Sequence, residues 1–81
     1  MSKSEIKLKY PVTVEEVETQ NLSMRRPKVK DMLAGEKKGA SDAEKEIRIF
    51  ANLCEVAPEV IKELDMVDYG AVQKAYQAFL S

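Results

Sequence analysis

Apolar and polar residues alternate along residues 5–14, which is the pattern of a strand with one buried side. The positions that share the apolar side are Ile6, Leu8, Tyr10, Val12 and Val14. Pro11 has no backbone N–H to donate, so it places this strand at a sheet edge or ends it. The pattern therefore predicts an edge strand at the start of the chain.

A polar turn at residues 15–16 and a second alternating segment at residues 17–24 predict the returning strand of a hairpin. The apolar phase slips by one residue between Thr19 and Leu22. A single slip of this kind is what a bulge produces. We therefore expect a bulge near Gln20 and Asn21.

Helical spacing begins after Pro27, where Val29, Met32 and Leu33 recur at intervals of three and four. Gly39 can supply the left-handed residue that ends a helix. We expect a short helix from about residue 28 to 38, with Val29 and Met32 entering the core.

Three more helix starts follow. Ser41 and Glu44 stand in capping-box register, and the apolar stripe after them predicts a core helix. Pro58 suits the first position of a short third helix, and Asp65 can cap a last helix from Met66 to Leu80.

The last helix has more apolar circumference than a surface helix requires. Its aromatic and large residues form one stripe, and its small residues form a second stripe beside it. The first stripe is Tyr69, Val72, Tyr76, Phe79 and Leu80, and the second is Val67, Ala71, Ala75 and Ala78. Together they span roughly 220°, against about 100° for a helix on the surface of a globule. Either the helix packs centrally on several neighbours, or one stripe is a docking surface for another chain.

Length and composition fit one small α+β domain. We assign residues 1–81 to a single domain, with a hairpin at about 5–25 and three to four short α-helices at about 28–80. The chain is 44% hydrophobic and 33% charged, as folded domains are. Its single cysteine, Cys54, allows no disulfide within the chain and indicates a reducing cytoplasm. Its apolar runs are too short to span a membrane.

Catalytic chemistry is poorly represented. The chain has no histidine, and one cysteine cannot build a zinc site. Its three glycines form no phosphate-binding loop. Acidic pairs such as Asp65 and Asp68 lie at a helix start, where capping and solvation explain them. We therefore expect no catalytic, metal-binding or cofactor-binding residues, and not an enzyme.

Charge is unevenly distributed. Residues 1–40 carry nine Lys or Arg against six Asp or Glu, and residues 41–81 carry four against eight. The basic run is Arg25, Arg26, Lys28 and Lys30. A pI near 5.5 and the lack of aromatics between Tyr10 and Phe50 argue against nucleic-acid binding. We expect the two arginines to pair with carboxylates of the acidic half or of a partner.

Several short patterns carry a family resemblance over about residues 6–80. They are Leu22-x-Met24-Arg25-x-Pro27 leading to Asp31, Ala57-Pro58-Glu59-Val60, Leu64-Asp65-x-x-Asp68-Tyr69 and the closing Phe79-Leu80. With them the chain resembles the small tail assembly chaperones of Mu-like and related contractile-tailed phages. One departure is Glu15-Glu16, where such sequences often have an Asp-Gly turn.

The resemblance implies a role in the bacterial host cytoplasm during tail morphogenesis. Its implied client is the phage tape measure protein, kept soluble until the tail tube protein, a second candidate partner, polymerises around it. We predict that the partner-binding residues are Tyr69, Val72, Ala75, Tyr76, Phe79, Leu80, Arg25 and Arg26. The alternatives are a small regulatory or nucleic-acid-binding domain, and a structural homo-oligomer that uses the second stripe between its copies.

Overall fold

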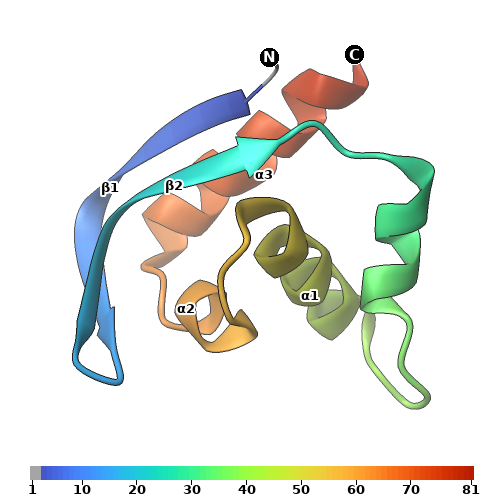
Figure 1. The fold of residues 1–81 in the computed structure, drawn as a ribbon, viewed down its shortest axis with the longest axis horizontal. Coiled ribbons are helices and arrows are strands. Elements are labelled where there is room, and N and C mark those ends of the chain that lie inside the picture. The colour runs from blue at the N-terminus through green and yellow to red at the C-terminus, as the bar shows by residue number, and fades with distance from the viewer. Residues whose placement is uncertain (1–2) are drawn as a thin grey trace.

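A two-stranded antiparallel hairpin precedes four helical segments in the computed structural model, which describes residues 3–81 (Figure 1). The predicted α+β class, a hairpin followed by helices, is confirmed. The elements are β1 (Lys3–Val14), β2 (Val17–Arg25), the 3-10 helix η1 (Val29–Gly35), α1 (Asp42–Cys54), α2 (Pro58–Lys62) and α3 (Met66–Leu80). None of the helices among the described residues is long and apolar enough to cross a membrane.

The hairpin turn has two left-handed residues. Glu15 has φ of 50° and Glu16 has φ of 67°, and Val14 pairs with Val17 on either side of them. Two-residue hairpin turns need positive φ because this matches the twist of the strands, and Asn-Gly or Asp-Gly usually supplies it. Glutamate adopts the same geometry here at a cost on the order of 1 kcal/mol per residue.

The strand register breaks where the apolar phase slips. Lys7 pairs with Asn21 and Val12 pairs with Thr19, so Gln20 lies opposite the four residues 8–11 of β1. The predicted irregularity near Gln20 is confirmed, although the additional residues belong to β1. Pro11 is one of these four residues, and it fits the break because it has no backbone N–H to donate to the strand ladder.

Tyr10, which lies within the break, is not buried with the other apolar residues of β1. Its side chain is 49% exposed, whereas Ile6, Leu8 and Val12 are buried. The sequence pattern therefore locates the buried positions Ile6, Leu8 and Val12, whereas Tyr10 at the break stays about half exposed.

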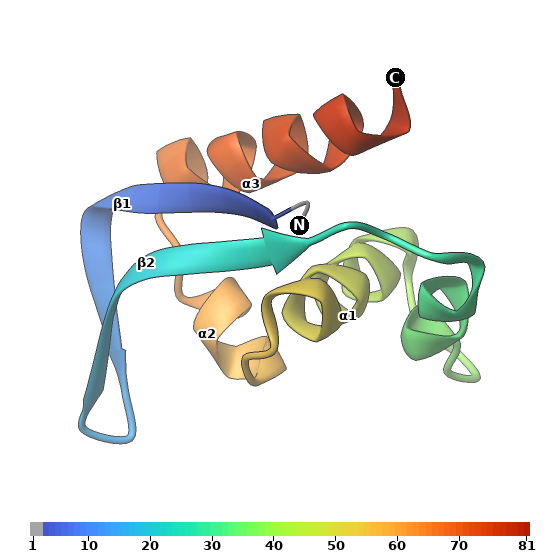
Figure 2. The ribbon, with the colours of Figure 1, turned by 45° about the horizontal axis from the view of Figure 1, so that its top comes forward.

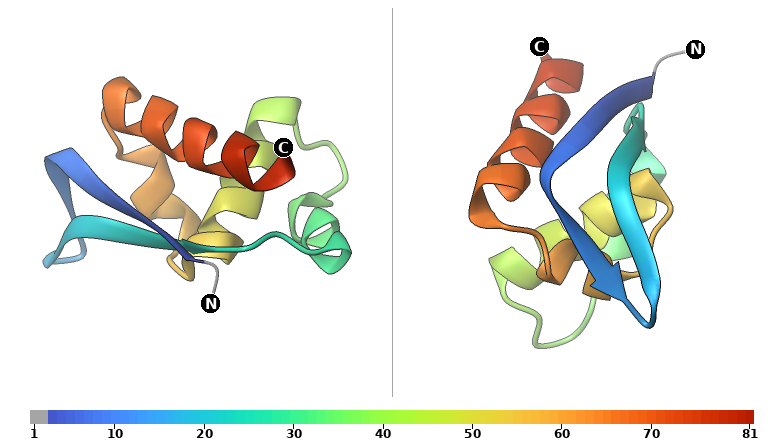
Figure 3. Two further views of the ribbon diagram at one scale, coloured as in Figure 1. Left: turned by 90° about the horizontal axis from the view of Figure 1, so that it is seen from above. Right: turned by 90° about the vertical axis from the view of Figure 1, so that its left-hand side faces the viewer.

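The core lies between the inner side of the hairpin and α1, α2 and α3. Helix α3 runs beside β1, and α1 lies beside β2 (Figures 2 and 3). The buried apolar residues are Ile6, Leu8, Val12, Leu22, Met24, Phe50, Ala51, Leu53, Cys54, Ile61, Leu64, Val72 and Ala75. Strands and helices therefore share one cluster of side chains. Cys54 belongs to this cluster, and the burial of its thiol raises its pKa to about 11.

The predicted helix starts are confirmed by their caps. The Ser41 hydroxyl accepts from the Glu44 N–H at 3.2 Å, and the Glu44 carboxylate accepts from the Ser41 N–H at 3.1 Å. This backbone hydrogen bond lowers the pKa of Glu44. The Asp65 carboxylate accepts from the Val67 N–H at 2.9 Å, so α3 begins at Met66 as predicted.

The segment after Pro27 differs from its prediction. It forms the 3-10 helix η1, which ends at Gly35, and its residues Val29, Met32 and Leu33 are 83%, 66% and 70% exposed. The expectation that Val29 and Met32 enter the core is therefore wrong. The inner side of η1 instead carries Asp31, which is 2% exposed.

Two close contacts explain this inversion. Asp31 turns inward because four donors surround its carboxylate, as described below. Gly35 is buried against α1, where a Cβ would lie 2.9 Å from the Lys45 carbonyl oxygen and 3.1 Å from Ile49 Cγ1. Gly39 has the expected positive φ, 82°, but it belongs to a separate turn after η1.

Candidate partner-binding site

The inner side of α3 belongs to the core. Val72 is 0% exposed and Ala75 is 9% exposed, so both side chains are occupied inside the molecule. Tyr69, Tyr76 and Phe79 are half-buried against the same core. Of the eight residues predicted to bind a partner, these five face inward wholly or in part.

The exposed apolar residues of α3 lie toward its two ends. Met66 and Val67 in the first turn are 78% and 59% exposed, and Leu80 in the last turn is 58% exposed. Part of the second stripe is also accessible, since Ala71 is half-buried and Ala78 exposed. The excess apolar circumference is therefore smaller than the sequence pattern suggests, and it is concentrated at the helix ends.

Aromatic rings fill the space between α1 and α3. The centroid of the Phe50 ring on α1 lies 5.8 Å from that of Tyr69 and 5.3 Å from that of Tyr76. Tilted ring pairs at these distances are favourable beyond the area they bury. The two helices are thus joined by large, flat side chains that leave hollows beside them.

Two hollows open along this boundary. The first, about 190 Å³, is lined by residues that include Glu46, Ile49, Phe50 and Tyr76. The second, about 160 Å³, lies at the start of α3 and is lined mainly by apolar residues. They are Ala43, Ile47, Ile61, Leu64, Met66 and Tyr69, together with Lys62.

A hydrogen-bonded bridge crosses the boundary between the hollows. The Tyr69 hydroxyl donates to Glu46 Oε1, and Gln73 Nε2 donates to the same oxygen at 3.0 Å. Burial and the hydrogen bond to Glu46 together raise the pKa of Tyr69 above its ordinary value. The bridge therefore links Tyr69, which lines the second hollow, to Glu46, which lines the first.

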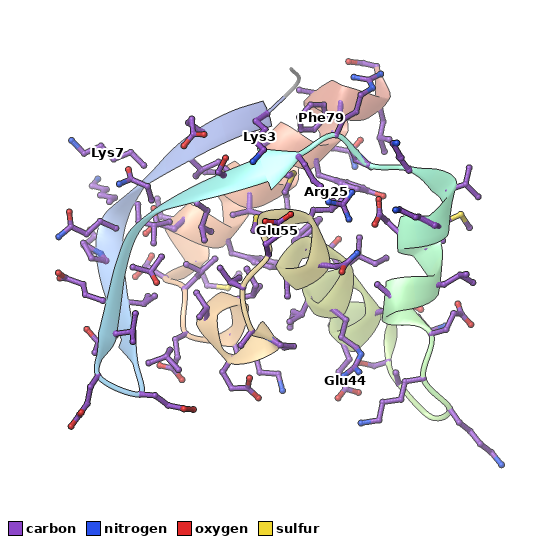
Figure 4. The ribbon with its side chains drawn as sticks, in the orientation of Figure 1. Lys3, Lys7, Arg25, Glu44, Glu55 and Phe79 are labelled. Carbon is purple, nitrogen blue, oxygen red and sulfur yellow. The ribbon has the colours of Figure 1, made fainter. Side chains whose placement is uncertain are left out.

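Arg26 is the exposed member of the arginine pair. Its guanidinium carbon lies 5.7 Å from the centroid of the Phe79 ring, which connects the exit of β2 to the last turn of α3. Such cation–π contacts contribute about 0.5 to 1 kcal/mol at exposed sites. Figure 4 shows Phe79 beside the end of β2.

Arg25, by contrast, has an internal partner. Its Nη1 and Nη2 atoms donate to the two carboxylate oxygens of Asp31 at 3.0 Å and 2.7 Å, which raises the pKa of Arg25. The expectation that Arg25 pairs with the acidic half or with a partner is wrong for this contact, because Asp31 lies in residues 1–40.

Asp31 collects two further hydrogen bonds that the sequence analysis missed. The Lys28 N–H donates at 2.7 Å, and Asn52 Nδ2 on α1 donates at 2.8 Å. The Arg25 hydrogen bonds, reinforced by the Lys28 amide, lower the pKa of Asp31 to about 2. The three-residue spacing from Lys28 to Asp31 is the same as in a capping box, and it is the local signal by which a reader of the sequence could have found the Lys28 contact.

Asp68 plays a comparable structural role. It is 2% exposed, and its two carboxylate oxygens accept from the N–H groups of Lys9 and Tyr10 at 2.9 Å each. These amides belong to the β1 segment that the register break leaves without β2 partners. The expectation that capping or solvation explains Asp68 is therefore wrong, because its buried carboxylate joins α3 to β1.

Comparison with known proteins identifies the family. The family model described as phage tail assembly chaperone proteins, E, or 41 or 14 matches residues 5–81. Neither the curated proteins nor the solved structures gave a match. The match covers the hairpin from residue 5 onward and all the helices among the described residues, and it confirms the resemblance to this family. The chain therefore belongs to the phage tail assembly chaperone family.

Proposed function

We propose that this chain is a non-enzymatic binding protein that keeps the phage tape measure protein soluble until tail tube subunits assemble around it. The observation that carries the proposal is the family match over residues 5–81. Such a protein works in the host cytoplasm, where tail proteins are made. It needs an apolar surface for its client, and that surface must be accessible in the folded chain.

We assign the client surface to the hollow lined by Ile49, Phe50 and Tyr76, with Asp42, Lys45 and Glu46 as its charged lining, together with exposed Leu80; we call it the client groove. Leu80 follows Tyr76 by four residues, so it extends the same side of α3 by one turn. Grooves with aromatic floors accept the apolar side of an amphipathic helix. The client segment is accordingly an apolar helical one.

The other predicted partner residues contribute in different ways. Tyr69 lies at the far end of the boundary, where its bond to Glu46 holds the wall of the groove. Val72 and Ala75 stabilise the core on which the groove is built, and Arg25 stabilises η1 through its ion pair with Asp31. Arg26 and Phe79 are placed to meet an acidic side chain of the client at the edge.

Release is part of this function, because the client must pass to the growing tail. A shallow groove with a small apolar area fits an affinity at the weak end of specific complexes. The hollow of about 190 Å³ has room for one or two client side chains.

Co-expression with the tape measure protein tests the proposal. Leu80→Asp changes an exposed residue of the client groove, and we expect it to lower the soluble fraction of the client at least severalfold. Val17→Asp is the matched control, because Val17 is 65% exposed at the hairpin turn. Deleting α3 is a poorer test, since it removes Val72 and Ala75 from the core.

Two outcomes would contradict these assignments. A client that stays insoluble with the wild-type chain contradicts the proposed function. Equal solubility with the wild-type chain and Leu80→Asp contradicts the assignment of the groove. Arg26 tests the edge of the client groove. We expect Arg26→Glu to weaken the complex with the tape measure protein and to make its affinity less sensitive to salt.

A further inference from the structure

Three large apolar side chains project from the outer side of η1. Val29, Met32 and Leu33 are 83%, 66% and 70% exposed; we call these three the η1 knob. A 3-10 helix repeats every three residues, so Met32 lies one turn after Val29 and Leu33 lies beside it. Views from several directions place η1 at one end of the molecule, away from the hairpin turn (Figures 1, 2 and 3). The η1 knob is therefore an apolar projection at one end of the fold.

The η1 knob is held rigidly from behind. The inner side of η1 is fixed by the hydrogen bonds that Asp31 accepts from Arg25 and Asn52. Gly35 closes the end of η1 against α1. A short helix that buries an aspartate and exposes its large apolar residues is inverted relative to an ordinary surface helix. Exposed apolar groups held in this way mark an interaction surface.

Positive charge surrounds the η1 knob. Residues 25–40 carry six Lys or Arg and two Asp or Glu, and one of each, Arg25 and Asp31, pair with each other. The remaining charges of this segment are all exposed. They are Arg26, Lys28, Lys30, Lys37 and Lys38 against Glu36. The next acidic residues along the chain are Asp42 and Glu44, at the start of α1. The segment that carries the knob therefore complements an anionic partner.

Size and shape decide which anionic partner fits. A specific protein interface covers roughly 800 Å² on each side, far more than three side chains of a seven-residue helix provide. A protein partner would also need a hollow that matches the knob. A lipid surface needs neither, because lipids rearrange around inserted side chains and each nearby lysine adds its own attraction to anionic headgroups. The knob and its lysines therefore suit a membrane surface better than a protein.

We propose that the η1 knob inserts into the surface of a membrane that contains anionic lipids, with Lys28 and Lys30 at the lipid phosphates. Lysine suits this place, because its apolar stem can lie along the acyl chains while its ammonium group stays among the headgroups. The chain then lies on the membrane and does not cross it. Three side chains bury little apolar surface, so the attachment is reversible. This activity goes beyond the proposed function, since its surface differs from the client groove and it requires no client.

Vesicles of defined composition test the proposal. At low salt, the wild-type chain should co-sediment with vesicles of equal parts phosphatidylglycerol and phosphatidylcholine. Its affinity for them should be at least about tenfold higher than for vesicles of phosphatidylcholine alone, and it should fall as salt is added.

A tryptophan reporter tests insertion directly, because the chain has no tryptophan of its own. On binding to the mixed vesicles, the emission of Met32→Trp should shift to shorter wavelength. Val17→Trp is the matched control, since Val17 at the hairpin turn is 65% exposed and Met32 is 66% exposed. The emission of Val17→Trp should not shift.

Charge reversal locates the contact on η1. Lys28→Glu with Lys30→Glu should weaken binding to the mixed vesicles at least about tenfold. Lys7→Glu with Lys62→Glu makes the same change in net charge at exposed positions of β1 and α2, elements that lie away from η1 (Figure 1). This control should weaken binding less than about threefold, because salt screens distant charges. Far-UV circular dichroism confirms that each variant is folded.

Three results would overturn the proposal. They are wild-type binding that is no tighter to the mixed vesicles than to the neutral ones, no emission shift for Met32→Trp, and equal losses in the two charge-reversed variants. Failure to bind the mixed vesicles, together with a loss of client solubility in Lys28→Glu with Lys30→Glu, would assign the knob to an acidic protein surface and not to a membrane.

Discussion

Asp31 is a buried carboxylate with four hydrogen-bond donors, and its charge is needed for the fold near η1. Hydrogen bonding to Arg25 lowers its pKa to about 2 from an ordinary 3.8. A depressed folded-state pKa means that this group stabilises the fold fully above the unfolded-state value. The contribution is lost as the pH falls from about 4 toward 2.

We predict that Asp31→Asn lowers the free energy of unfolding at pH 7 by about 2 kcal/mol, because it leaves the Arg25 charge unpaired. Urea unfolding at pH 7 and at pH 2 to 3 measures the effect, and the difference from wild type should shrink at the lower pH. Asp42→Asn is the control, since Asp42 is exposed in the first turn of α1. Differences that are equal at both pH values would contradict this role.

Sequence distance decides which of these residues could be predicted. The Ser41–Glu44 and Asp65 caps are local, so spacing alone predicts them. Asp31 meets Asn52 at a separation of 21 residues, and Asp68 meets β1 at separations of 58 and 59. A pattern within one element carries no information about such partners.

At the scale of elements, two glycines have opposite requirements. Gly35 allows η1 to close on α1, and an added Cβ would lie 2.9 Å from a backbone oxygen. Gly70 lies inside α3, where an added Cβ would meet no atom within 4 Å. The same substitution should therefore have opposite effects at the two positions.

We predict that Gly35→Ala destabilises the chain by about 1 to 3 kcal/mol through overpacking against a fixed backbone. Gly70→Ala should stabilise it by up to about 1 kcal/mol, because alanine is the better helix former. Thermal unfolding of both variants against wild type measures the pair. A stabilising Gly35→Ala would mean that η1 does not pack closely on α1.

The helices show what local pattern can and cannot provide. Caps and apolar spacing located α1, α2 and the full extent of α3, because their stripes face the core. The same spacing in η1 placed the apolar residues on the wrong side. Tertiary hydrogen bonds to Asp31 outweigh the burial of Val29 and Met32, and spacing does not encode that competition. For the candidate site, spacing identified the excess apolar circumference of α3. It could not show which of those apolar residues are buried in the core and which are exposed.

At the scale of the whole molecule, the hairpin and the helices depend on one core. Met24 on β2 is 0% exposed, and it belongs to the cluster that includes Phe50 of α1 and Val72 of α3. A domain of this size has a net stability of about 4 to 12 kcal/mol. The loss of one buried side chain is therefore a large part of the total.

We predict that Met24→Ala lowers the free energy of unfolding by about 2 to 4 kcal/mol. Met32→Ala is the matched control, because Met32 is 66% exposed and should change stability by less than about 0.5 kcal/mol. Far-UV circular dichroism and tyrosine fluorescence should report the same midpoint in each variant. Equal midpoints for the two methionine variants would show that β2 does not pack into a shared core.

The two hydrogen bonds that the amides of Lys9 and Tyr10 donate to Asp68 also set an order of events during translation. The acceptor is made 58 to 59 residues after its donors, which at 5 to 20 residues per second is a delay of roughly 3 to 12 s. During that interval the nascent hairpin has free amides at the edge of β1, where a neighbouring polypeptide can add as a strand. Emergence of α3 from the ribosome removes that opportunity, so a segment translated later protects one that is translated earlier.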